Sequence, residues 1–240
     1  MDHPSPPPTA TVVAQAVDLR PDWERWQMSL KCQGPRGTCS VFAVTAAIEH
    51  AVARRARAGV RLSEEFLNAV ANRVDGSRAD GGFFHDIWRG YERHGICEER
   101  YLPYAAKFDP DLRIPPGAWA NARSRRLRGF RLAWIKEWDV ATGLSTRHLD
   151  AVRATLLRGV PVLAGMRWPR EPVWDGDLLR MCPPADVFDG HSVLIVGFEP
   201  REGAPGGEAF LVRDSGGGGR WCAIPLAFIA AYVNDAAWVE

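Results

Sequence analysis

The stretch from Gln33 to Ala43 constrains the chain more than any other part of it. Two glycines and a proline force an irregular loop, and a run with strong helical character follows directly from Cys39. This order places the Cys39 thiol at a helix N-terminus, where free backbone N–H groups and the helix dipole favour the thiolate. We therefore predict a helix that begins at Cys39 and a thiol whose pKa lies below that of an ordinary cysteine.

Gln33 precedes this cysteine in the same loop and can supply a side-chain amide donor. Such a donor, together with the backbone N–H of Cys39, meets the requirement of an oxyanion hole for acyl transfer, provided that the loop folds back over the helix start. The alternative is a buried structural cysteine after a turn, since free cysteine is among the most buried residue types. Residues farther along the chain must decide between the two interpretations.

The composition limits the class of protein. The chain has 240 residues, of which 46% are hydrophobic and 25% charged, so it can form one large domain or two lobes that share a cleft. Its formal net charge of +1 gives no general attraction to nucleic acid or anionic lipid. The N-terminus lacks the apolar region of a secretory signal, and no apolar run is long enough to span a bilayer. We expect neither a nucleic-acid partner nor a membrane partner.

The cysteines indicate the redox environment. Cys32, Cys39, Cys97, Cys182 and Cys222 form an odd and sparse set without a C-x-x-C pair. This set argues against a disulfide framework and against a zinc site. We predict a cytoplasmic protein with reduced thiols that uses no metal or other cofactor.

The first half of the ordered chain has helical patterns. Residues 1–17 are proline-rich at first and then small and polar, which predicts a flexible tail before a single catalytic domain at residues 18–240. N-cap residues, apolar stripes and terminal glycines predict three helices, at about residues 39–57, 64–75 and 83–94.

The second half is β-rich. We expect an extended segment, a helix and then five strands, at residues 130–135, 146–158, 160–166, 191–198, 209–214, 221–224 and 236–239. A long irregular segment, residues 167–190, leads to His191, and connections of this length usually have a function. The order predicts an α+β fold with a helical lobe at about residues 33–116 and a β-rich lobe at about residues 117–240.

Three residues far apart in the sequence can form one chemical unit across the cleft of such a fold. Cys39 begins a helix of the first lobe, His191 begins a strand of the second, and Asp214 ends the next strand. A cysteine nucleophile, a histidine base and a third residue that holds the imidazole tautomer can accept, transfer and release an acyl group. The pattern therefore favours nucleophilic catalysis over a structural cysteine.

Six pieces in matching order resemble the papain family of cysteine peptidases, and most of all its short bacterial members made without a propeptide. The resemblance covers roughly residues 18–240. The pieces are the loop from Gln33 to Cys39, Leu62–Glu65, Gly81-Gly82, Tyr101–Tyr104, Gly190–Val193 and Phe210–Ser215.

The resemblance implies a papain-like fold in which a helical lobe packs against a barrel-like β lobe, with the active site in the cleft between them. It implies Cys39 as nucleophile, His191 as base and then acid, Gln33 in the oxyanion hole and Asp214 as the residue that orients His191. Peptide substrate would be bound by three glycines, Gly81, Gly82 and Gly190.

The chain also departs from the family pattern. Ser40 replaces the aromatic residue that usually follows the nucleophile, and Arg36 replaces a cysteine that forms a disulfide in secreted members. Asp214 stands where the family has an asparagine, and the tryptophan-containing loop that shields this asparagine is shortened to residues 216–221. The last departure bears directly on activity.

These features predict a cysteine-type peptidase or amide hydrolase that forms an acyl-enzyme intermediate with a peptide or protein substrate. One alternative is a papain-fold protein that binds peptides or proteins with little or no cleavage. Another is a cysteine-dependent acyl transferase related in chemistry to transglutaminases or cyclases. We also expect activity without N-terminal cleavage, because the residues before the nucleophile loop are too few for an inhibitory helical domain. The sequence leaves the oligomeric state open.

Overall fold

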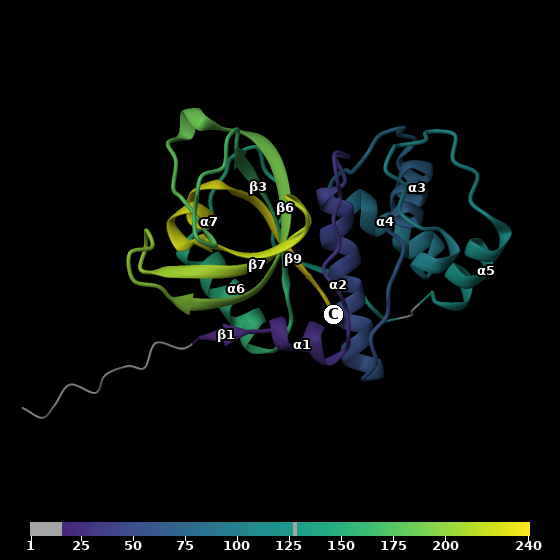
Figure 1. Ribbon diagram of the computed structural model, residues 1–240, viewed down its shortest axis with the longest axis horizontal. Helices are drawn as coiled ribbons and strands as arrows, with labels where there is room; N and C mark the ends of the chain where they lie inside the picture. Colours follow the sequence, from purple (N-terminus) through teal and green to yellow (C-terminus); the bar gives the residue numbers. More distant parts are fainter. Residues whose placement is uncertain (1–15, 127–128) are drawn as a thin grey trace, which may run out of the picture.

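The structure of the protein is a computed structural model that describes residues 16–126 and 129–240. A helical lobe and a lobe built on a sheet lie side by side, and the long helix α2 (Cys39–Ala56) runs along their boundary (Figure 1). The flexible tail expected at residues 1–17 lies outside the described residues except for Ala16 and Val17. Val17 already belongs to the sheet, where it pairs with Phe198.

The chain goes from a helical first part to a β-rich second part, as the sequence predicted, with several short additional elements. The remaining helical elements are α1 (Arg20–Arg25), α3 (Glu64–Asp75), α4 (Phe84–His94), η1 (Glu99–Tyr101), α5 (Pro116–Ser124), α6 (Thr146–Leu157), η2 (Pro184–Asp186) and α7 (Leu226–Tyr232). The strands are β1 (Val17–Asp18), β2 (Leu132–Lys136), β3 (Val162–Pro169), β4 (Trp174–Asp175), β5 (Leu178–Leu179), β6 (Val187–Pro200), β7 (Glu208–Asp214), β8 (Arg220–Pro225) and β9 (Val233–Val239).

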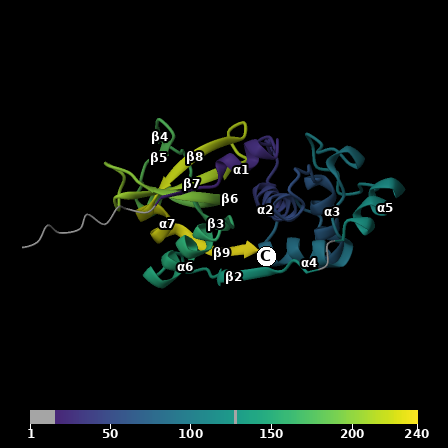
Figure 2. The ribbon, with the colours of Figure 1, turned by 90° about the horizontal axis from the view of Figure 1, so that it is seen from below.

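Helix α2 is buried on nearly every side because both lobes pack against it. All residues from Ser40 to His50 are buried. Its apolar side chains, Val41, Val44 and Ile48, share one core with Leu163 and Leu194 of the sheet. The view from below shows α2 between the sheet and the helices α3 and α4 (Figure 2). The position of the first residue of α2 is therefore fixed by contacts with both lobes.

Helices α3 and α4 complete the helical lobe. Ser63 caps α3 as predicted, since its hydroxyl accepts a hydrogen bond from the Phe66 N–H at 3.0 Å. The two helices pack closely at Gly90, where an added Cβ would lie 2.7 Å from the backbone nitrogen of Ala71. Helix α5 belongs to the same lobe, because its Ala118 is fully buried in the same core.

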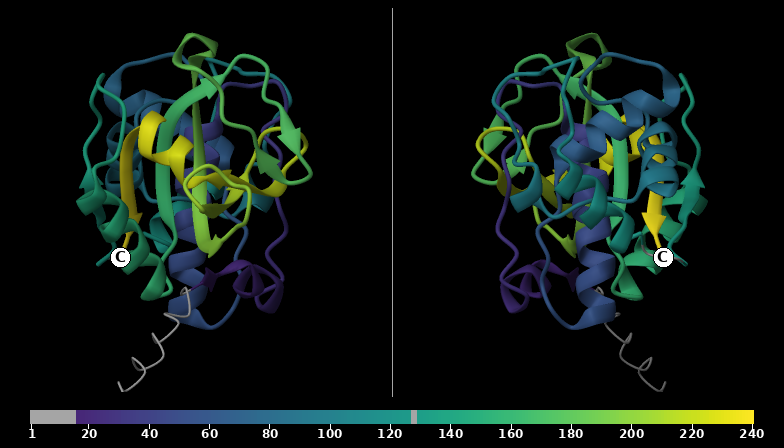
Figure 3. Two further views of the ribbon diagram at one scale, coloured as in Figure 1. Left: turned by 90° about the vertical axis from the view of Figure 1, so that its left-hand side faces the viewer. Right: turned by 90° about the vertical axis from the view of Figure 1, so that its right-hand side faces the viewer.

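The β lobe is one sheet with strand order β2-β9-β3-β6-β7-β8-β5-β4, and β1 adds to β6. Seen from the end, its long strands curve around a second apolar core that α6 and α7 close (Figure 3). Most neighbouring strands are antiparallel, and β5 pairs with β8 in parallel. The predicted two-lobed α+β fold is therefore confirmed.

The segment at residues 167–190 is more regular than the sequence indicated, and the prediction of an irregular connection was wrong at both ends. Strand β3 continues to Pro169 and β6 begins at Val187, so Arg167 pairs with Gly190 and Met166 with His191. Pro169 is the last residue of β3, where a missing N–H costs no ladder hydrogen bond, and the other prolines of the segment lie between the two strands. His191 thus lies inside a long antiparallel hairpin.

No helix in the described part of the chain has the length and hydropathy of a membrane span. All five cysteines lie in that part, and each is a free thiol.

Candidate active site

Cys39 is the first residue of α2, and its thiol is partly exposed in a cleft between the lobes. Thr38 occupies the N-cap position but provides no side-chain cap, and its hydroxyl instead bonds the phenol of Tyr104 at 2.7 Å. The first N–H groups of the helix are therefore available to a neighbouring anion. The backbone N–H groups of Ser40 and Ser192 contact the sulfur, which stabilises a thiolate.

His191 and Asp214 meet on the other side of the cleft. The Nε2 atom of His191 lies 2.8 Å from Oδ1 of Asp214, and the imidazole is also hydrogen-bonded to the Cys39 thiol. Asp214 is held in turn by the Gly216 N–H, which donates to Oδ1 at 2.8 Å, and by the more distant Arg220 Nε at 3.4 Å. The structure thus brings together the three residues expected to act as a unit.

The electrostatics favour an ion pair between Cys39 and His191. Burial disfavours the charged forms of both groups, but their mutual hydrogen bond and attraction outweigh it, so the pKa of the Cys39 thiol is lowered. The pKa of His191 is raised to about 9, since Asp214 and Cys39 both accept hydrogen bonds from its ring and carry negative charge. Burial also opposes ionisation of Asp214, yet His191, Gly216 and Arg220 lower the pKa of that carboxyl.

An aromatic side chain shields His191 even though the loop after Asp214 is short. The ring of Trp168, at the end of β3, lies with its centroid 4.7 Å from that of His191. Trp168 also contacts Trp174, and Arg220 stacks on Trp174 with its guanidinium carbon 3.6 Å from the ring centroid. Trp221, in the shortened loop, packs against Trp23 of α1 instead. The hairpin at residues 167–190 therefore supplies aromatic cover for His191, although the loop at residues 216–221 is short.

Gln33 is fixed beside the nucleophile loop. Its Oε1 accepts a hydrogen bond from the Ser215 hydroxyl at 2.8 Å, and its Nε2 donates to the carbonyl of Arg36 at 2.8 Å. A primary amide has two N–H groups, so the second one is left for another acceptor. Gln33 makes no contact with Cys39 among the bonds of the described residues, and it does not line the cleft cavity around that thiol.

The three glycines expected to bind substrate have different positions. Gly82 and Gly190 line a cavity of about 230 Å³ that also contains Cys39 and His191. Gly82 donates its N–H to the Ser40 hydroxyl at 3.2 Å, so the serine that replaces the usual aromatic residue anchors this loop. Gly81 does not line the cavity: with φ of 74°, it packs on the nucleophile loop, and an added Cβ would lie 2.4 Å from the Gly37 carbonyl.

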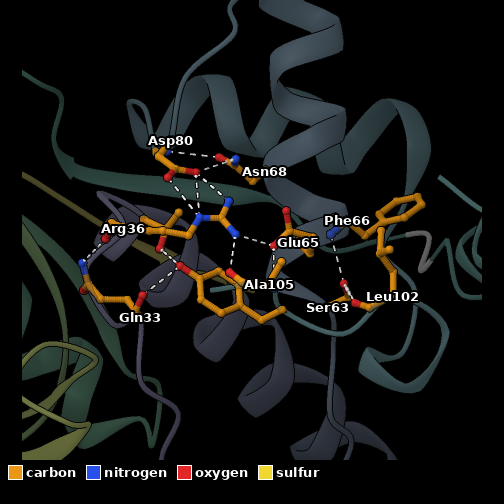
Figure 4. Close-up of polar contacts among 12 residues, drawn as sticks. Gln33, Arg36, Ser63, Glu65, Phe66, Asn68, Asp80, Leu102 and Ala105 are labelled. Atoms are coloured by element: carbon orange, nitrogen blue, oxygen red, sulfur yellow. Dashed lines mark hydrogen bonds and ion pairs between the residues drawn. The ribbon is translucent and has the colours of Figure 1, made fainter. Parts of the chain in front are cut away.

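Arg36 links the nucleophile loop to the glycine loop through a buried ionic network (Figure 4). Its guanidinium bonds Asp80 through Nε and Nη2 and Glu65 of α3 through Nη1. It also donates to the carbonyl of Ala105 at 2.8 Å and lies over the Tyr104 ring at 4.6 Å from the centroid. Loss of one partner of a buried ion pair costs about 3–5 kcal/mol, so this network holds the two loops together at the position where secreted family members have a disulfide.

The described residues contain no group of three or more histidine, cysteine, aspartate or glutamate side chains placed to hold a metal ion.

This geometry agrees with an independent comparison of the sequence with protein families. Residues 13–222 match the family described as papain family cysteine protease. The chain belongs to the papain family of cysteine proteases. The match covers the helical lobe and the β lobe as far as Cys222, and it confirms the resemblance that the six sequence pieces indicated.

Solved structures with the same fold come from distant relatives. The chain superposes on xylellain, a cysteine protease from Xylella fastidiosa, with a TM-score of 0.72 at 18% identity, covering 94% of this chain and 85% of that one. It superposes on digestive procathepsin L 3 of Tenebrio molitor larval midgut with a TM-score of 0.62 at 20% identity, covering 97% and 71%. No curated protein sequence matches the chain significantly. The papain-like fold is thus confirmed.

Proposed function

We propose that this member of the papain family is an active peptidase that cleaves peptide bonds through a Cys39 acyl-enzyme intermediate. The observation that carries the proposal is the hydrogen-bonded order of Cys39, His191 and Asp214 across the cleft. A nucleophile bonded to a base that is itself oriented by a third group is the arrangement that acyl transfer requires.

The reaction follows from the charges of the pair. The Cys39 thiolate attacks the carbonyl carbon of the peptide bond, and the imidazolium of His191 gives its proton to the leaving amine as the C–N bond breaks. His191 is then neutral, and it takes a proton from a water molecule that attacks the thioester. The C–S bond breaks, the carboxylic acid product leaves, and the thiolate–imidazolium pair is restored.

Gln33 and the N–H of Cys39 would stabilise the oxyanion that forms in both steps. The support for Gln33 is its fixed amide, whose oxygen is held by Ser215 and whose second N–H is left free by the bond to Arg36. Gly82 and Gly190 would bind the peptide backbone from the two sides of the cavity. The cytoplasmic location and bacterial origin expected from the sequence likewise remain proposals.

The direct test is hydrolysis of a library of internally quenched peptides, with products identified by mass spectrometry. We expect cleavage products that gain one water, and a loss of about ten-thousandfold or more in the Cys39→Ala variant. Cys32→Ser is the matched control, because Cys32 is the exposed thiol just before the same loop and its sulfur accepts a hydrogen bond from the Gly34 N–H at 3.3 Å. Cleavage that persists in Cys39→Ala would contradict the proposal. So would products joined to an amine instead of water, or the absence of any cleavage by the native protein.

Replacement of Gln33 tests the oxyanion hole. Gln33→Ala should lower kcat about 100-fold to 1,000-fold, because an oxyanion donor acts mainly in the transition state. Alkylation of Cys39 by iodoacetamide forms no oxyanion, so its rate should change little. An equal loss in both assays would show that the loop has lost its structure, and an unchanged kcat would exclude the role of Gln33.

Replacement of Asp214 tests the third residue of the unit. An ionised carboxylate beside His191 raises the pKa of the imidazole to about 9, and activity should fall above that pH as the imidazolium loses its proton. Asp214→Asn keeps a hydrogen-bond acceptor but removes the charge, so the alkaline limb of kcat/KM should move about one pH unit lower. Asp214→Ala should lose roughly a hundredfold or more in rate.

The exposed Asp175 offers a matched control for this pH experiment, since Asp175→Asn removes a carboxylate outside the site. That variant should leave both limbs of the profile in place. A native rate and profile in Asp214→Ala would show that Asp214 is not part of the catalytic unit.

A further inference from the structure

The short loop after Asp214 brings an arginine to the residue that orients His191. Residues 215–219 join β7 to β8, and in the antiparallel register of these strands Asp214 lies directly opposite Arg220. The Arg220 Nε atom donates to the Asp214 Oδ2 atom at 3.4 Å. The Oδ1 atom faces His191 and also accepts the Gly216 N–H, both at 2.8 Å. Both oxygens of the carboxylate are therefore held by protein groups.

Glycines make this short return of the chain possible. Gly217, Gly218 and Gly219 have φ values of 57°, 95° and 78°, in a region that residues with a Cβ rarely adopt. The Gly219 N–H bonds the Gly216 carbonyl at 3.0 Å, which closes the turn. The shortened loop departs from the family pattern, and in this chain it delivers Arg220 to the Asp214 carboxylate.

Trp174 holds the Arg220 side chain in place. The guanidinium carbon lies 3.6 Å from the centroid of the Trp174 ring, which is a cation–π contact. Trp174 belongs to β4, and β4 and β5 lie beside β8, whose first residue is Arg220 (Figure 2). Strand pairing therefore fixes both partners, and the stacked arginine loses less freedom on pairing with Asp214 than a free surface arginine would.

The proposed reaction changes the charge beside Asp214. The Asp214 side chain is 2% exposed, and a buried carboxylate is costly without a cationic partner. In the resting protein the imidazolium of His191 is that partner, but His191 becomes neutral once it has protonated the leaving amine. Among the described residues, the other cation within ion-pair distance of Asp214 is Arg220. Its guanidinium stays charged throughout, because arginine does not lose its proton in proteins.

Other titratable groups near this pair add no positive charge. Cys39, on α2, is the anionic partner of His191. Cys222, on β8, feels the Asp214 charge, but burial raises the pKa of its thiol to about 12, so the thiol is neutral. Asp235, on β9, lines the cleft cavity, and burial raises the pKa of this carboxyl to about 6. Removal of Arg220 would therefore leave the Asp214 charge without compensation whenever His191 is neutral.

We propose that Arg220 is a positioning residue that supplies the permanent counter-charge of Asp214 while His191 is neutral, which is the stage at which water attacks the thioester. The proposal rests on the proposed peptidase function and adds a residue to its catalytic unit. Without Arg220, an uncompensated carboxylate would favour the imidazolium form of His191. A protonated His191 cannot accept the proton of the attacking water, so hydrolysis of the acyl-enzyme would slow.

The first experiment measures acylation and deacylation separately by stopped flow, after active-site titration of Cys39 to count functional molecules. Loss of a nearby charge shifts a pKa by about one unit, which lowers the fraction of neutral His191 about 10-fold below that pKa. Deacylation in Arg220→Met should therefore fall about 10-fold at neutral pH and recover as the pH is raised. Since the acyl-enzyme accumulates, kcat and KM should fall together.

Two further variants show whether the charge is responsible. Arg220→Lys keeps a cation and should lose less of the deacylation rate than Arg220→Met. Arg158→Met is the matched control, because Arg158 also lies over a tryptophan ring, Trp238, and near a carboxylate, Glu240, but does not line the cleft cavity. Its deacylation rate should equal that of the native protein. Equal losses in Arg220→Lys and Arg220→Met, or a loss that does not recover at higher pH, would overturn the proposal.

The second experiment needs no peptidase activity. NMR titration of His191 in Cys39→Ala removes the thiolate, so Asp214 and Arg220 dominate the charge around the ring. The His191 pKa should rise by about one unit in Cys39→Ala/Arg220→Met, because loss of a cation favours the imidazolium. It should stay in place in Cys39→Ala/Arg158→Met.

The two experiments separate this proposal from the peptidase function. If the native protein cleaves no peptide, the proposed function fails, and the NMR titration decides on the counter-charge alone. If peptides are cleaved but the His191 pKa is unchanged or lower in Cys39→Ala/Arg220→Met, Arg220 is not the counter-charge of Asp214 and only this inference fails.

Discussion

The hydrogen bond between Cys39 and His191 joins two residues that belong to different lobes. Neither lobe can form the site alone, so each must hold its own residue firmly in place. The helical lobe does so by burying α2 from Ser40 to His50 between two packed surfaces. The β lobe does so by placing His191 inside the β3–β6 hairpin, paired with Met166.

Buried ion pairs hold the loops that surround the site. Arg36 joins the nucleophile loop to Asp80 and Glu65, and Lys31 joins the preceding segment to Glu49 and Glu64. These acceptors lie on or beside α2 and α3. Since buried charges are tolerated only when they are paired and hydrogen-bonded, the networks allow one arrangement of the loops.

The sequence predicted the features that depend on local chemistry. Loop glycines, the Ser63 cap and apolar periodicity placed α2, α3 and α4 correctly. The papain-like motifs predicted that Cys39, His191 and Asp214 lie close together. Features that depend on distant partners were missed. Arg36 appeared only as the loss of a disulfide, and Trp168 lay in a segment that the sequence predicted to be irregular. Burial and pairing across the sheet give these residues their environment, and neither can be seen along one chain.

We expect Asp214 and Cys39 to keep His191 protonated in the free protein. NMR titration of the His191 ring, assigned by comparison with a His191→Gln variant, measures this directly. The His191 pKa should be about 9, and it should fall in Cys39→Ser because the thiolate is gone. A His191 pKa near the ordinary value of about 6.5, unchanged by Cys39→Ser, would contradict it.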